Sequence, residues 1–78
     1  MYWVYVLKSS LTDKRYVGHT SNLEDRLCRH NKGEVRFTKR FRPWFVAYKE
    51  SFKSRSQAVI RERQLKAGQG RKFLEKAI

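Results

Sequence analysis

The sequence predicts an α+β fold with the element order β-β-α-β-α-α, in which helices flank a small three-stranded antiparallel sheet. Two patterns support this prediction: runs of β-branched and aromatic residues alternate with segments of helical periodicity, and turn-forming residues separate them. The length of 78 residues is near the lower limit for one hydrophobic core. We therefore expect a single domain over residues 1–78.

The first two strands are expected at the start of the chain. Residues 2–7 read Tyr-Trp-Val-Tyr-Val-Leu, a composition that favours a strand buried on at least one face. Turn-forming residues occupy positions 9–14, and residues 15–18 resume as a short strand, so the pair most simply forms an antiparallel hairpin. Gly18 ends this strand and allows either a positive φ or the close approach of another group.

A helix is predicted to begin at Ser21, because Ser21 and Glu24 have the spacing of a capping box. Leu23 and Leu27 lie one turn apart and give this helix an apolar stripe. Gly33 is a typical residue for the end of such a helix.

The segment after this helix is polar and basic. Residues 34–42 predict an exposed loop, which ends at Pro43. Residues 44–48 are rich in aromatic and β-branched side chains and predict the third strand.

Two helices are predicted in the last third of the chain. Ser54 or Ser56 can cap a helix that runs to about Lys66. The Gly-Gln-Gly segment 68–70 is expected to end it, and residues 71–77 fit a short final helix.

The chain is strongly basic: 19 lysines and arginines oppose 7 acidic residues, for a formal net charge of +12. Such an excess attracts polyanions, of which nucleic acid is the commonest, although anionic lipid would attract the same charge. The basic residues are spread along the chain rather than along one amphipathic helix, which argues against a membrane surface. No apolar run approaches the roughly 18 residues of a membrane-spanning helix, and no basic leader precedes the first strand. We therefore expect a nucleic-acid partner and no membrane partner.

Cys28 is the only cysteine, which excludes an intramolecular disulfide and a zinc site of several cysteines. An inert, partly buried thiol within the first helix is favoured over a nucleophile. The lone cysteine fits a reducing compartment, and we expect a cytoplasmic protein.

Glu62 lies on the inward stripe that Ala58, Val59 and Leu65 define in the second predicted helix. A carboxylate on such a stripe is costly unless it is paired with a cation or bound to a metal. A metal-binding or catalytic role for Glu62 therefore competes with an ion pair to an arginine from a neighbouring element.

Arg26 and His30 are four residues apart and project from one helix face. A guanidinium there can hold a phosphate through two parallel hydrogen bonds, although a solvated surface cation has the same spacing.

Tyr5 and Tyr16 lie on strands that are predicted to pair; packing is the default role of each, and the alternative is that both phenols reach one site. A phenol with a pKa of about 10 is a poor base at neutral pH, so nearby cations would be needed to lower that value.

Four short motifs occur at characteristic spacings along the chain. Tyr5 ends Trp-Val-Tyr, Tyr16 begins Tyr-Val-Gly, Arg26 follows ten residues later, and Glu62 lies in Arg-Glu-Arg-Gln-Leu-Lys. Together they resemble the GIY-YIG nuclease family, and the resemblance covers essentially the whole chain. The pattern is similar to the small stand-alone bacterial branch, which is related to the N-terminal nuclease module of the excision-repair incision protein.

Two positions differ from the family pattern. Trp3 stands where the first motif has its glycine, and Val17 stands where the second has an isoleucine. The valine is a conservative change, and the tryptophan is tolerable if its side chain faces outward from the strand.

The resemblance implies cleavage of DNA phosphodiester bonds with Mg²⁺ or Mn²⁺ as the cofactor; RNA remains an alternative substrate. Glu62 matches the family's metal-binding carboxylate and Arg26 its phosphate-binding arginine. Tyr5 and Tyr16 match the motif tyrosines, and in some members one of them, here Tyr5, takes a proton from the attacking water. His30 matches a histidine of some branches that assists this base, so all five residues are candidate catalytic residues.

A second group of residues is expected to bind DNA. His19 occupies a position where repair-type members often carry a lysine. The remaining members are the four cations of the basic loop, which we expect to clamp the DNA backbone: Arg36, Lys39, Arg40 and Arg42.

Three functions remain open at this point. The first is a divalent-metal-dependent DNA endonuclease, with repair or recombination as its setting. The second is a nucleic-acid-binding relative that cuts poorly, and the third is a nuclease subunit that needs a protein partner for targeting. The sequence is compatible with a monomer or a weak homodimer.

Overall fold

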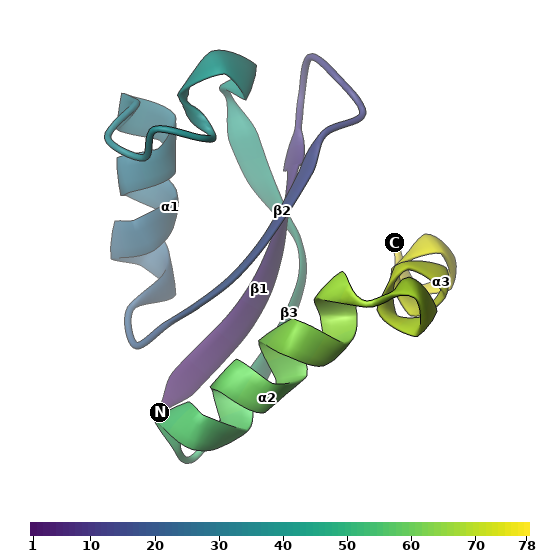
Figure 1. Cartoon of the computed structure of the whole chain (residues 1–78). Helices are drawn as coiled ribbons and strands as arrows, with labels where there is room; N and C mark the ends of the chain where they lie inside the picture. The colour runs from purple at the N-terminus through teal and green to yellow at the C-terminus, as the bar shows by residue number, and fades with distance from the viewer.

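The computed structural model describes all 78 residues, and its elements follow one another in the predicted order (Figure 1). The strands and helices are β1 (Tyr2–Ser9), β2 (Arg15–Thr20), α1 (Leu23–Lys32), the 3₁₀ helix η1 (Lys39–Phe41), β3 (Trp44–Phe52), α2 (Arg55–Lys66) and α3 (Gly68–Ala77). The three strands form one antiparallel sheet, which confirms the predicted α+β fold class. None of these helices combines the length and the apolar character that crossing a membrane requires.

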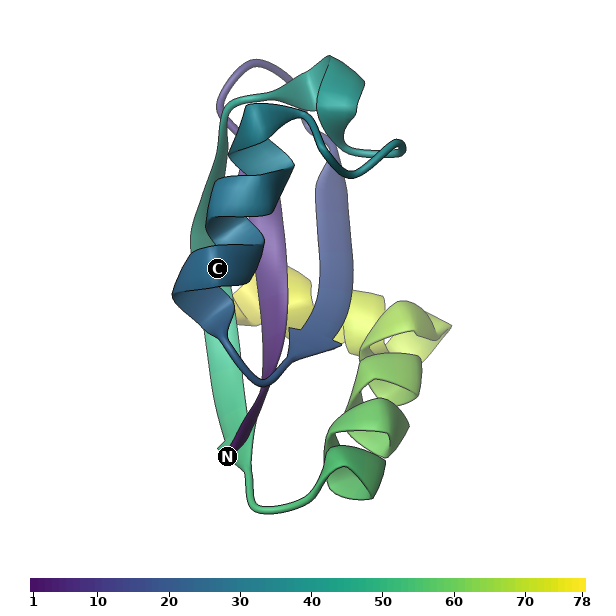
Figure 2. The same ribbon diagram turned by 90° about the vertical axis from the view of Figure 1, so that its left-hand side faces the viewer.

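The strand β1 is central in the sheet, with β2 and β3 as its two edges. Figure 2 shows α1 in front of the strands and α3 behind them, so the helices cover opposite faces of the sheet. Side chains alternate along β1, and each face therefore receives its own set of apolar residues. Below, the α1 face is the one that carries Tyr5 and Leu7, and the α2 face is the one that carries Val4 and Val6.

Each face has its own hydrophobic cluster. On the α2 face, Val4 and Val6 are buried with three helical residues, Ala58, Leu65 and Leu74. Burial of such side chains stabilises the fold by about 1.5–3 kcal/mol for each large residue, which makes this cluster the main anchor of α2 and α3.

The cluster on the α1 face is built differently, because it contains a tyrosine. Tyr5, Leu7 and Trp44 are buried there, and the predicted stripe of Leu23 and Leu27 packs against them. This packing holds α1 against the α1 face of the sheet, with Leu23 and Leu27 beside the buried cluster that contains Tyr5.

The first helix starts one residue later than the capping-box prediction. Asn22, and not Ser21, is the N-cap: its side chain accepts a hydrogen bond of 3.0 Å from the backbone N–H of Asp25. A local turn favours this choice, because the backbone N–H of Asn22 donates to the hydroxyl of Thr20 at 3.1 Å. Gly33 ends the helix as predicted, with a φ of 82°.

The segment 34–42 is more ordered than the exposed loop that the sequence predicts. It contains η1, and Thr38 within it is fully buried. The indole N–H of Trp44 donates to the carbonyl of Thr38 at 2.8 Å, which ties the loop to the sheet. The third strand also runs beyond its predicted end, because it pairs with β1 as far as the contact between Tyr2 and Phe52.

The final helix begins at Gly68, three residues before its predicted start. The break after α2 lies at Ala67 alone, whose backbone is extended with φ −77° and ψ 169°. Gly70 is required for close approach, since a Cβ there would lie 2.2 Å from the carbonyl oxygen of Gln64. Ser54 caps α2, as one of the two predicted alternatives.

Candidate active site

The phenol of Tyr5 belongs to a buried chain of hydrogen bonds. Tyr5 Oη lies 3.1 Å from His30 Nε2, and His30 Nδ1 lies 2.7 Å from Thr38 Oγ1. The Thr38 hydroxyl donates in turn to the carbonyl of Val35 at 3.3 Å. Because this hydroxyl has one proton, Nδ1 must donate to it, and Nε2 is left to accept the proton of Tyr5. The chain therefore assigns one tautomer to His30.

Burial holds both partners in their neutral forms. Burial and the positive charge of Arg26 lower the pKa of His30 to about 4. Burial raises the pKa of Tyr5 to about 12, although hydrogen bonding to Arg26 acts in the opposite direction. Arg26 thus lowers the pKa of Tyr5 as the sequence suggests, but desolvation outweighs it. At neutral pH, Tyr5 is a neutral phenol that donates to a neutral imidazole.

Arg26 reaches the phenols from α1. Interaction with the phenol of Tyr5, and more weakly with that of Tyr16, raises the pKa of Arg26. Its Nε is buried and has no hydrogen-bond partner among the protein atoms. Buried donors are ordinarily paired, so the unpaired Nε of Arg26 is an exception among the buried side-chain polar atoms.

Tyr16 lies beside Tyr5 on the α1 face, with the two ring centroids 6.3 Å apart. Gly18, the cross-strand partner of Tyr5, makes room for both rings. A Cβ at Gly18 would lie 2.7 Å from Tyr5 Oη and 3.0 Å from Tyr16 Cε2. The Tyr-Val-Gly motif therefore has a steric reason: its glycine admits two phenols at one point of the sheet.

Glu62 approaches from α2, on the other face of the sheet. His19 pairs with Val4 and so lies on the α2 face, where its Nδ1 is 2.5 Å from Glu62 Oε1. Lys66 Nζ contacts the second carboxylate oxygen at 2.6 Å. Burial raises the pKa of Glu62, but hydrogen bonds from Lys66 and His19 outweigh it and lower the pKa below its usual value. Glu62 is thus an ionised carboxylate with an exposed side-chain fraction of 17%.

The edge strand β2 lies between the phenols of Tyr5 and Tyr16 and the carboxylate of Glu62. Its alternate residues face α1 and α2, so Gly18 on the one face and His19 on the other connect the phenols to the carboxylate. The negative charge of Glu62 also contributes to the raised pKa of Tyr5. The site therefore consists of a tight cluster of Tyr5, Arg26 and their neighbours, with Glu62 near it across the edge of the sheet.

A comparison with known protein families identifies the family of this chain. The model of the GIY-YIG catalytic domain matches residues 1–74. The chain belongs to the GIY-YIG family. Domains of this family are nucleases, so membership indicates a hydrolase that acts on nucleic acid.

Relatives of this GIY-YIG chain include several UPF0213 proteins. That of Staphylococcus haemolyticus is 38% identical over 66 residues, which cover 83% of this chain and 79% of the relative. That of Natronomonas pharaonis is 36% identical over 67 residues, or 85% and 78% of the two chains. The solution NMR structure of the UPF0213 protein from Bacillus halodurans has a TM-score of 0.57 and 22% identity, with coverage of 96% of this chain and 82% of that one. These matches confirm the small stand-alone branch that the motifs indicate.

The donor set of this GIY-YIG domain fits a hard cation held largely by non-protein ligands. No group of three or more histidine, cysteine, aspartate or glutamate side chains converges in the structure. Glu62 offers one ionised carboxylate, with the imidazole of His19 beside it. Mg²⁺ commonly binds through one or two carboxylates together with waters and substrate phosphates, and this pattern suits Glu62.

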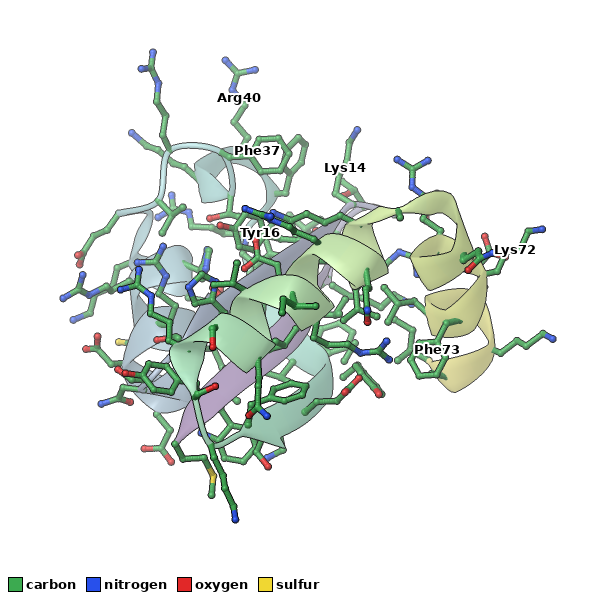
Figure 3. The ribbon with its side chains drawn as sticks, turned by 60° about the horizontal axis from the view of Figure 1, so that its bottom comes forward. Lys14, Tyr16, Phe37, Arg40, Lys72 and Phe73 are labelled. Atoms are coloured by element: carbon green, nitrogen blue, oxygen red, sulfur yellow. The ribbon has the colours of Figure 1, made fainter.

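The basic loop of the GIY-YIG domain gathers four of the five residues predicted to bind DNA. Its cations surround a hollow of about 610 Å³ together with Phe37 and Phe41: Arg36, Lys39, Arg40 and Arg42. Figure 3 shows Arg40 and Phe37 on the same side of the molecule as Tyr16. His19 lies apart from this loop, at the carboxylate of Glu62.

The sequence analysis assigns no functional role to three residues that lie at the site. Lys66 could be found from its position, because it follows Glu62 by four residues on one helix. Thr38 and Phe37 lie in the loop, where no periodicity indicates that one is buried and the other exposed. Cys28 is fully outside the site, and it is exposed rather than partly buried as the sequence suggests.

Proposed function

We propose that this GIY-YIG chain is a divalent-metal-dependent endonuclease that hydrolyses DNA phosphodiester bonds, in repair or recombination in the cytoplasm. The observation that carries the proposal is the meeting of the Arg26 guanidinium with the Tyr5–His30 pair, beside the ionised Glu62. A net charge of +12 supports a polyanionic substrate.

Arg26 and Glu62 have different electrostatic roles in the proposed reaction. Arg26 binds the non-bridging oxygens of the scissile phosphate and offsets the charge that builds up there in the transition state. Glu62 would hold Mg²⁺ or Mn²⁺, and the ion would supply Lewis-acid stabilisation of the developing negative charge. Lys66 and His19 keep the carboxylate ionised and oriented before the ion binds.

Tyr5 and His30 move the proton. The attacking water gives a proton to Tyr5 Oη as the phenol passes its own proton to His30 Nε2, so Tyr5 remains neutral and His30 becomes charged. The positive charge of Arg26 opposes this transfer in the free protein, because it lowers the pKa of His30. A phosphate bound to Arg26 offsets that charge, so substrate binding should raise the pKa of His30, although burial, the larger cause, continues to lower it.

The proposal is tested by incubating the purified protein with supercoiled plasmid and with linear duplex, flap and junction DNAs. We expect nicks when Mg²⁺ or Mn²⁺ is present and none when EDTA replaces the metal. Binding without cleavage in every metal would instead identify a nucleic-acid-binding module. Equal cleavage in EDTA would refute the metal dependence, and cleavage of RNA alone would refute the DNA substrate.

Thr38→Val should slow single-turnover cleavage about tenfold or more, up to the roughly hundredfold at the lower end of general-base effects. Valine cannot accept the Nδ1–H of His30, so the imidazole is no longer held in the tautomer that accepts from Tyr5. The orphaned buried donor should also lower the free energy of unfolding by about 1–3 kcal/mol. Nitrogen NMR of His30 reports the tautomer directly, independently of activity. Thr38→Ser keeps the hydroxyl and should restore both readouts; a wild-type rate and tautomer in Thr38→Val would contradict this role.

Neutralising the basic loop should weaken DNA binding equally for unrelated sequences. The paired variants Arg36→Gln/Arg40→Gln and Lys39→Gln/Arg42→Gln should each reduce the slope of log K against log salt by about 2, because each contact releases about one counterion. The measurement is a salt titration of binding to two unrelated duplexes in EDTA. The pair Lys72→Gln/Lys76→Gln on α3 removes the same charge elsewhere and should leave the slope unchanged. A loss confined to one sequence would show base readout in place of a backbone clamp.

A further inference from the structure

A groove of about 830 Å³ lies between β2, Phe37 and the ends of α2 and α3 that meet near Lys66 and Arg71. It adjoins the cluster of Tyr5, Tyr16, Arg26 and His30, which is called the catalytic cluster below. It begins at Tyr16 and includes Lys66, the partner of the Glu62 carboxylate. The volume lies within the range of about 300–1,000 Å³ that is typical of small-molecule sites. None of the catalytic steps proposed above uses this space.

The lining of the groove combines positive charge with an apolar floor. Four cations, namely Lys14, Arg15, Lys66 and Arg71, outnumber its two acids, Asp13 and Glu75. The apolar lining comes from Val17, Leu65, Leu74 and Phe37. A ligand that matches this lining has a flat apolar part and negative charge beside it, which is the chemistry of a nucleotide.

Phe37 forms one wall and is 60% exposed. Its ring centroid lies 6.2 Å from that of Tyr16 at an interplanar angle of 36°. Figure 3 shows Phe37 next to Tyr16, with Lys14 to one side and Arg40 beyond it. A large aromatic ring is therefore held at the mouth of the catalytic cluster, between cations and largely open to solvent.

We propose that this groove binds an unpaired nucleotide next to the scissile phosphate, with its base stacked on Phe37 and its phosphates held by Lys14 and Arg71. Bases within a duplex have their faces covered by neighbouring bases, so a protein ring can stack only on a base that has left the duplex. The substrate class is thus a strand with at least one unpaired nucleotide beside the cut, such as a flap or a single strand. This inference rests on the proposed nuclease function and specifies its substrate.

Binding in EDTA tests the inference without cleavage. The probes are a fluorescent duplex with a five-nucleotide flap and the same duplex fully paired. We expect Phe37→Leu to weaken binding to the flap probe about tenfold, because it removes the stacking surface, and to leave duplex binding within about twofold. Phe37→Trp should bind the flap probe at least as well as the wild type. Phe73→Leu makes the same change on α3, outside the groove, where Phe73 packs on Tyr48 and Arg61, and it should alter neither affinity.

An abasic scan locates the stacked base. Removing the base at one flap position should weaken wild-type binding by the same factor as Phe37→Leu. When the two changes are combined, the affinity for the flap probe should fall no further than with either change alone. Additive losses at every position, or an equal loss for flap and paired duplex, would overturn the inference. If no metal supports cleavage but flap binding still depends on Phe37, the nuclease proposal fails and the subsite stands. If the protein cleaves and Phe37→Leu leaves flap binding unchanged, the subsite fails and the nuclease stands.

Discussion

Glu62→Ala, and equally the isosteric Glu62→Gln, should lower metal-stimulated cleavage by about a thousandfold or more, because the site has a single carboxylate to hold a divalent ion. The neighbouring acids cannot replace it, since no other carboxylate contacts His19 or Lys66. The fold should survive, because Glu62 belongs to neither hydrophobic cluster and its partners His19 and Lys66 are themselves partly exposed. Plasmid nicking in Mg²⁺ measures the activity, and Mn²⁺ binding followed by electron paramagnetic resonance measures the loss of the ion.

Glu50→Gln is the matched control for this experiment. Glu50 is also a partly buried carboxylate in an ion pair, with Arg61 at 3.0 Å, but it lies on β3, where it accepts a hydrogen bond from Tyr48 and contacts neither His19 nor Lys66. Its loss should leave both nicking and Mn²⁺ binding unchanged. Nicking by Glu62→Gln at close to the wild-type rate would remove Glu62 from the mechanism, whatever its effect on stability.

The elements of the fold follow from local patterns, whereas their boundaries depend on contacts that those patterns do not contain. Asn22 and Ser21 are equally good N-caps in isolation, and the turn at Thr20 selects the asparagine. Glycine is a helix breaker in sequence-based prediction, but Gly70 lies within α3, at the point where α3 contacts Gln64 and Leu65 of α2. The third strand exceeds its predicted length because β1 offers it a partner as far as Phe52. Each difference is therefore a tertiary effect on a correctly identified element.

The candidate site divides in the same way. The helical spacing of Arg26 and His30 and the pairing of the two tyrosine strands are local properties, so the cluster around Tyr5 could be predicted. The contact of Glu62 with His19 depends on how α2 packs against β2, which no spacing reveals. Thr38 is the clearest case, because a loop threonine becomes a hydrogen-bond partner of His30 only through the burial of its loop. The roles of all these residues stay predictions until the variants are measured.

Arg26→Ala should slow cleavage by two to three orders of magnitude, about the effect of removing one preorganised donor from a transition state. Arg26→Lys should recover little of this, because a single ammonium cannot make the paired hydrogen bonds of a guanidinium. Arg26→Ala, which removes the charge, should also raise the pKa of His30 from about 4, since burial and the charge of Arg26 together lower it. Proton NMR titration of the imidazole measures this shift without any substrate.

Arg29→Ala on the same helix separates these effects from a general loss of charge. Arg29 is exposed and pairs only with Asp25, so its removal should change neither the cleavage rate nor the titration of His30. A raised pKa of His30 with an unchanged rate in Arg26→Ala would mean that Arg26 tunes the imidazole but does not bind the scissile phosphate. A reduced rate with an unchanged pKa would mean the reverse, and the coupling of phosphate binding to proton transfer would be wrong. Only the two changes together support a base whose pKa rises when the phosphate binds, because a single guanidinium then contacts the phosphate and influences the imidazole.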